Sequence, residues 1–238
     1  LAGDGTKDYP YNVTSYDDRR AIGSGEYTLD KHYYQTQDID ASMSHPDSCK
    51  KHGSEFLYEP IGTGTGLFDG VYDGGGNSIT NLWLQADRDT VGLFYGIGTK
   101  GTVQNLTLKA FNVQGKNYVG ALAGVNSGTL SKVGVQNLVK PDECKCSYND
   151  TIVVTEVKGI DFVGCMLGAQ TGGATSQSYT VCNVEGSEHV GGFAGALSGA
   201  ADNSLSKAMV LAKNIAGGFA GSADAATMDK VYAAGFVK

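Results

Sequence analysis

The five cysteines are the residues of this sequence with the clearest capacity for covalent chemistry or metal binding. They are Cys49, Cys144, Cys146, Cys165 and Cys182. In an oxidising compartment, two disulfides can form and one thiol is left over, either free or bridging to another subunit. Cys165 and Cys182 fall in one repeat of the chain, where buried thiols and a disulfide are both open. Cys144 and Cys146 would pair outward, and Cys49 is a candidate partner for one of them.

Two groups of residues have the donor types of a metal site. Cys49 and His52, together with Cys144 and Cys146, would supply four zinc ligands if two separate loops met in space. Disulfides are the favoured alternative for these cysteines in a surface protein. Oxygen donors suited to calcium cluster near turns, at Asp38, Asp40, Asp69, Asp73 and Asn77. Asp and Asn also shape turns without any ion, and we favour that interpretation. The sequence therefore predicts no resident metal and no cofactor.

Catalytic patterns are weak. Residues 96–101 match G-x-G-x-x-G, but another strand follows rather than the helix whose N-terminus binds phosphate. The three arginines, Arg19, Arg20 and Arg88, lie outside the repeats described below. The aspartates within the repeats do not fall at one register, as paired catalytic carboxylates would. We therefore expect a protein that is not an enzyme, with a polysaccharide-cleaving β-helix as the catalytic alternative.

Three sequons are candidate N-glycosylation sites, although three-residue matches also arise by chance. They begin at Asn12, Asn105 and Asn149. Asn149 is the best placed, because it lies in a predicted loop.

A six-residue phrase occurs five times and is the main signal for the fold. It begins as Val91-Gly92-Leu93-Phe94-Tyr95-Gly96, and its later copies start at Val119, Val163, Val190 and Ala216. The starts are separated by 28, 44, 27 and 26 residues. About a dozen residues after a copy comes an alternating apolar–polar run such as Thr102–Leu108, the period of a strand with one buried face. Each repeat is thus predicted to contain short strands joined by turns.

If each repeat forms one coil, a single coil cannot bury its own apolar face, whereas stacked coils bury their apolar faces against one another. The sequence therefore predicts an all-β, right-handed parallel β-solenoid with coils of roughly 26–28 residues. Equivalent apolar residues should form a ladder in the core: Phe94, Leu122, Met166, Phe193 and Phe219. Glycines that repeat in this sequence should lie where the backbone turns or packs tightly: Gly92, Gly120, Gly164, Gly191 and Gly217.

At these residues the chain resembles the GLUG-repeat family of bacterial and archaeal surface proteins. The resemblance extends upstream, to Tyr33–Asp40, Glu59–Gly62 and Leu67–Leu82, and covers about residues 20–238. It implies a right-handed β-helix on an extracellular surface, as in hemagglutinin-like adhesins and the non-catalytic region of immunoglobulin A peptidases. The cysteine-bearing insertions depart from the family pattern. No catalytic domain is attached, which weakens a peptidase interpretation.

The expected organisation has three parts. Residues 1–30 form an N-terminal arm or cap, residues 31–90 the first coils with an insertion at 43–56, and residues 91–238 the repeats with an insertion at 140–156. The chain stops at Lys238, short of another glycine phrase. Unpaired strand edges there are templates for association, so either the chain is truncated or a neighbouring subunit covers them.

Composition limits the function classes. The net charge is −7, and a weakly acidic surface repels the nucleic-acid backbone. No stretch approaches the ~18 apolar residues of a membrane span. We expect a secreted or cell-surface structural protein that associates with copies of itself in a layer, sheath or filament. An adhesin or module that binds glycans or a host surface is the non-catalytic alternative.

Overall fold

The structure is a computed structural model, and it describes residues 1–44, 60–63, 66–136 and 156–238. The strands that build the first part are β1 (Tyr11–Val13), β2 (His32–Gln35), β3 (Ile39–Asp40), β4 (Val71–Asp73), β5 (Ser78–Gln85), β6 (Phe94–Ile97) and β7 (Thr102–Gln114). The middle part contains β8 (Asn117–Val119), β9 (Ala123–Asn126), β10 (Thr129–Gln136), β11 (Glu156–Lys158), β12 (Asp161–Gly164), β13 (Leu167–Gln170), β14 (Ala174–Ser176) and β15 (Tyr179–Glu185). The last part contains β16 (Glu188–Gly191), β17 (Ala194–Leu197), β18 (Ala200–Asp202), β19 (Leu205–Leu211), β20 (Ala216–Gly217), β21 (Ala220–Ala223), β22 (Thr227–Asp229), β23 (Tyr232–Ala233) and β24 (Phe236–Val237). Helix α1 (Tyr16–Ala21) and the 3₁₀ helix η1 (Ser42–Ser44) complete the described elements.

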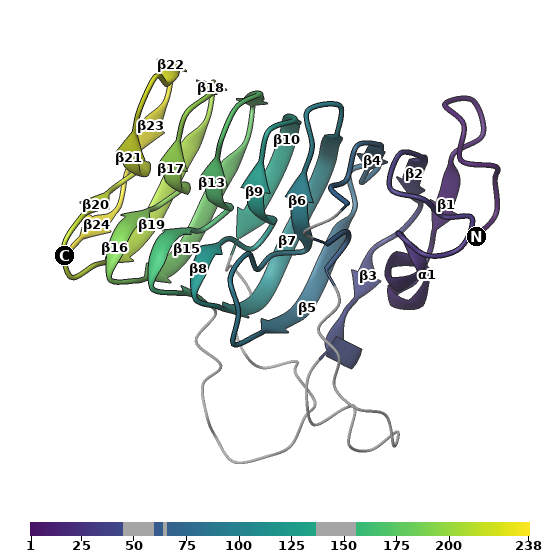
Figure 1. The fold of residues 1–238 in the computed structure, drawn as a ribbon, viewed down its shortest axis with the longest axis horizontal. Helices are drawn as coiled ribbons and strands as arrows, with labels where there is room; N and C mark the ends of the chain where they lie inside the picture. The colour runs from purple at the N-terminus through teal and green to yellow at the C-terminus, as the bar shows by residue number, and fades with distance from the viewer. Residues whose placement is uncertain (45–59, 64–65, 137–155) are drawn as a thin grey trace.

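The strands stack as the coils of a parallel β-solenoid, with the two ends of the chain at opposite ends of the stack (Figure 1). One face is the sheet in the order β20-β16-β12-β8, and a second is β21-β17-β13-β9-β6. The remaining strands form a 15-stranded sheet. Strand pairing is parallel and joins equivalent residues of successive coils, as in β7 with β10 and β15 with β19. The predicted stacking of coils is therefore confirmed.

The coils turn at corners where residues other than glycine take a left-handed backbone. One column of such residues is Asn105, Lys132, Gln177, Asn203 and Lys230, with φ between 45° and 55°. A second column is Thr90, Tyr118, Phe162 and His189, with φ between 46° and 61°. The strand register places each column on successive coils. Residues other than glycine rarely adopt this backbone conformation. Strand pairing with the neighbouring coils must therefore hold it in place.

The N-terminal end of the stack begins with strand β1 and helix α1. Strand β1 pairs in parallel with β2, so the ladder begins within the segment expected to be an arm or cap. Helix α1 follows, with the Ser15 hydroxyl accepting the Asp18 backbone N–H as its N-cap. Arg19 of this helix is 1% exposed, and its guanidinium donates to the Leu93 carbonyl at 3.0 Å. Arg19 thereby ties the helix to the first glycine phrase.

The interior is a single apolar cluster that includes all five residues of the predicted ladder. Leu122, Met166, Phe193 and Phe219 occupy equivalent positions in consecutive coils, because their neighbours pair in register. Phe94 is the correction: it pairs with Ala123, one residue beyond Leu122.

The shift of Phe94 has a local cause. Val91 forms a bridge with Val119, so four residue steps in the second coil, from Val119 to Ala123, lie beside three steps in the first. One extra residue in one strand is a β-bulge, which slips the register by one position.

Candidate functional site

The candidate site lies at the corner that leads into the sheet of β8, β12, β16 and β20. There the chain carries a recurring four-residue motif. Its first position is Gly, its second is any residue, its third is Asn or an acidic residue, and its fourth is a residue with an aromatic ring. The copies are Gly115–Tyr118, Gly159–Phe162 and Gly186–His189. A Cβ at Gly115, Gly159 or Gly186 would lie within 3 Å of a valine methyl group in the adjacent β-strands. These glycines therefore bring the chain close to the core before it turns through the ring residue.

The rings of this motif form a stack along the solenoid. Tyr118 and Phe162 have ring centroids 4.9 Å apart with planes 3° from parallel. Phe162 and His189 follow at 4.7 Å and 7°. All three side chains are half-buried. Their faces cover one another, which holds the His189 ring in one orientation.

A polar column runs beside the rings, one position earlier in each coil. Asn117, Asp161 and Glu188 are register partners. The Asn117 side chain donates to Asp89 at 3.0 Å, and the Asn214 side chain donates to Glu188 at 3.0 Å. Hydrogen bonds between coils thus fix these side chains.

Asp161 and His189 are the closest contact of the corner. His189 Nδ1 lies 2.7 Å from Asp161 Oδ1, which also accepts the Phe162 backbone N–H at 2.8 Å. One ligand atom each from Asp161, Glu188 and His189 lies within 4.8 Å of the others. An imidazole and two carboxylates thus converge from two adjacent coils.

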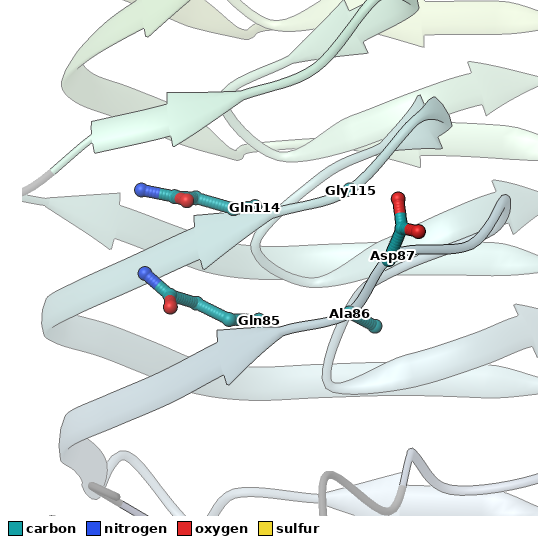
Figure 2. A pocket seen from close by; sticks show the side chains of 5 residues that line it. All are labelled: Gln85, Ala86, Asp87, Gln114 and Gly115. Carbon is teal, nitrogen blue, oxygen red and sulfur yellow. The ribbon is translucent and has the colours of Figure 1, made fainter.

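A shallow hollow lies at the same corner on earlier coils (Figure 2). It measures about 360 Å³ and is lined by Gln85, Ala86, Asp87, Gln114 and Gly115. Gln85 and Gln114 are register partners and point the same way in Figure 2. Asp87, its one ionisable lining residue, forms an ion pair with Lys116 at 3.1 Å. This lining has no pair of carboxylates for acid–base chemistry.

Cys165 and Cys182 form a disulfide, with their Cα atoms 6.3 Å apart. Cys165 follows β12 and Cys182 lies in β15, so the bond crosses the interior of one coil. In the next coil the equivalent positions hold Gly192 and Ala208. Of the two interpretations that the sequence leaves open, the disulfide is the one found.

The repeat glycines lie in tight packing. A Cβ added at Gly92, Gly120 or Gly164 would fall within 3 Å of backbone atoms of a neighbouring coil. The same overlap occurs at Gly191, whereas at Gly217 it is with the backbone of Ala220 in the same coil. None of the five has a positive φ among the described residues, so close approach rather than a turn requires glycine here.

The candidate calcium ligands are held by their own turns and neighbours. Asp38 accepts the Ser78 backbone N–H at 2.7 Å, and Asp40 accepts the Ser42 backbone N–H at 2.9 Å. Asp69 accepts the backbone N–H of Lys100 at 3.1 Å. Asp73 accepts side-chain donors from Gln104 at 2.7 Å and Asn105 at 3.0 Å, and Asn77 donates to the Gln35 carbonyl at 2.9 Å. These contacts agree with the turn-shaping role.

The remaining predicted sites are spread over the chain. Asn12 lies in β1, half-buried. The Asn105 side chain donates to Asp73 and takes part in a left-handed corner. Cys49, His52, Cys144, Cys146 and Asn149 lie outside the described residues, as do most of the two insertions. Their pairing and modification stay predictions.

Fold and pairing define the class of protein: a parallel β-solenoid with a disulfide inside one coil. A crystal structure from Bacteroides ovatus, named as that of a candidate immunoglobulin A1 protease, shares this fold. Its TM-score is 0.60 at 14% identity, over 97% of this chain and 76% of that chain. At that identity, the likeness concerns the fold alone.

Part of the chain is similar in sequence to two much longer proteins. Over 142 residues the chain is 38% identical to halomucin from Haloquadratum walsbyi, covering 59% of this chain and 2% of halomucin. It is 32% identical over 142 residues to a protein of Evansella cellulosilytica named as a candidate glycine-rich membrane protein, covering 56% of this chain and 15% of that protein. The chain thus spans a small part of either relative. No protein-family model matches, so membership of the GLUG-repeat family stays an expectation. Among the described residues, no helix is long and apolar enough to cross a membrane.

Proposed function

We propose that this chain is a non-catalytic structural segment of an extracellular surface protein, and that it associates with copies of itself. The names of the relatives, a mucin-like name and a membrane protein, support a place at the cell surface. The observation that carries the structural role is the stack of coils, which pair in parallel around one apolar interior.

The last coil presents apolar side chains to solvent. Exposed fractions are 51% for Met228, 64% for Tyr232, 59% for Phe236 and 45% for Val237. Strands β22, β23 and β24 each pair on one side within the described chain. Unpaired strand edges beside exposed apolar side chains are a template for another strand. We propose that a second copy of this segment pairs along these edges, which a further coil of a longer chain would also be able to occupy.

Sedimentation equilibrium of the disulfide-bonded chain tests this proposal. We expect a concentration-dependent dimer, and a shift to monomer when Tyr232→Ser and Phe236→Ser are combined. The matched control is Tyr9→Ser, which removes a side chain 70% exposed at the opposite end. A monomer at all concentrations, or dimerisation that the double variant leaves unchanged, would overturn the proposal.

The non-catalytic part of the proposal rests on the lining of the hollow. Its one ionisable residue, Asp87, forms an ion pair with Lys116. Incubation with immunoglobulin A1 and with a panel of acidic and neutral polysaccharides should leave the substrates intact. New immunoglobulin fragments or reducing sugar ends that disappear in Asp161→Asn would establish an enzyme instead.

A further inference from the structure

We propose that Asp161, Glu188 and His189 bind a divalent transition-metal cation, with Zn²⁺ as the representative ion. Asp161 lies at the start of β12, and Glu188 and His189 lie at the start of β16 in the next coil. Their ligand atoms lie within 4.8 Å of one another, so modest side-chain rotation brings them onto one ion. The site is independent of self-association.

The donor set selects the class of ion. Zinc binds His nitrogen at about 2.0–2.1 Å and carboxylate oxygen at about 2.0–2.2 Å, and its four-coordinate geometry accommodates these three donors with one position left for water. Calcium takes six to eight oxygen ligands, whereas one of the three donors at this corner is an imidazole nitrogen. Imidazole with carboxylates therefore favours zinc and its neighbours among the transition metals.

The surroundings orient each donor. The face of the His189 ring stacks on Phe162, which fixes the plane of the imidazole. The Asn214 amide donates to Glu188, and the Phe162 N–H donates to Asp161. Such outer contacts position metal ligands and raise affinity. A cation would replace the direct contact between His189 Nδ1 and Asp161 Oδ1.

A sugar is the competing ligand for a corner with aromatic rings and carboxylates. Sugars stack on an exposed ring face, whereas the faces of Phe162 are covered by Tyr118 on one side and His189 on the other. The ring stack thus offers edges rather than a platform. The geometry favours the cation.

The experiment uses the whole chain with Cys49, Cys144 and Cys146 changed to Ser, so that these thiols cannot bind metal. Titration calorimetry with Zn²⁺ should give one site, and Co²⁺ should give ligand-field absorption without a thiolate charge-transfer band. Asp161→Asn, Glu188→Gln and His189→Asn should each weaken binding at least tenfold. The first keeps the acceptor for Phe162, the second keeps the acceptor for Asn214, and Asn tolerates the left-handed backbone at position 189.

The control and the outer contact sharpen the test. Asp89→Asn removes a carboxylate of the same column two coils away and should leave affinity unchanged. Asn214→Ala should weaken binding about tenfold, the lower end of the usual outer-contact effect. Circular dichroism would verify that each variant folds. Failure of the thiol-free chain to bind either ion, or equal affinity in folded His189→Asn, would overturn the proposal.

Discussion

Phe193 and Phe219 stack face to face across two coils, with ring centroids 4.5 Å apart and planes 10° from parallel. Phe193 is fully buried, whereas Phe219 retains 7% of its surface exposed. Identical side chains at one register thus share their contact area, and the inner member of the pair has neighbours on both sides. Truncating the two rings should therefore have unequal effects.

Phe193→Ala should destabilise the C-terminal coils by about 3–5 kcal/mol, the usual effect of emptying a buried phenylalanine site. Phe219→Ala should cost less. Phe193→Leu is the matched control, because Leu122 occupies the equivalent position two coils earlier, and such a swap usually costs under about 1.5 kcal/mol. Urea unfolding followed by hydrogen exchange of β16–β21 measures these effects. Equal losses for the two alanine variants would contradict the stack's asymmetry.

The disulfide should be the main source of sensitivity to reductant. Joining Cys165 and Cys182, which are 17 residues apart, removes conformational freedom from the unfolded chain, for about 3 kcal/mol in the loop-entropy model. Changing both to Ala should lower the melting temperature and abolish its dependence on reductant. A chain with Cys49, Cys144 and Cys146 changed to Ser should keep that dependence. Peptide mapping without reductant should recover residues 165 and 182 in one linked fragment.

The left-handed corner at Gln177 should prefer glycine to a β-branched residue. Its φ is 49° and its side chain is exposed, so packing does not obscure the backbone effect. Gln177→Gly should be more stable than Gln177→Val by at least about 1–2 kcal/mol. At Lys207, an exposed position within β19, the order should reverse because valine suits a strand. Chemical denaturation of the four variants provides the comparison, and the same order at both positions would rule out the backbone explanation.

Asp38 should contribute to stability in a pH-dependent way. The Ser78 backbone N–H and hydroxyl, which donate to its carboxylate, hold the pKa of Asp38 below the ordinary aspartate value of 3.8, against an opposing effect of burial. A depressed folded-state pKa means that the stabilisation is complete above the unfolded pKa and is lost as pH falls through the folded one. Carboxyl NMR titration should place the Asp38 pKa below 3.8, and Ser78→Ala should raise it. An unchanged value in that variant would contradict the assignment.

Most of the architecture was predictable because the same residue types recur at regular spacing along the chain. The phrases beginning at Val91 and Val190 alternate glycine with apolar residues at a spacing that only stacked coils explain. The register shift at Phe94 was not predictable, because a bulge depends on which hydrogen bonds form between two coils. The sequence prediction placed Phe94 opposite Leu122 and was wrong by one residue.

The candidate site was missed, although a signal was present. The motif recurs just before the glycine phrase and ends in Tyr118, Phe162 and His189. Because these three residues differ in type, the motif is hard to recognise as a repeat. The positions of single histidines and aspartates in a sequence do not show whether their side chains meet in space. Their convergence became visible once the register placed Asp161 beside Glu188.

The order of residues alone determined that the coils repeat, that their apolar faces must be buried against one another, and that glycine is needed where backbones approach. These three conclusions follow from the spacing of residue types and from local steric limits. Both can be read from short stretches of the sequence. The tertiary structure decided that Cys165 reaches Cys182, that Arg19 of α1 reaches Leu93, and that His189 meets Asp161 across two coils. Such contacts join residues far apart in the chain, and their distances depend on the register and corner angles of every coil between them.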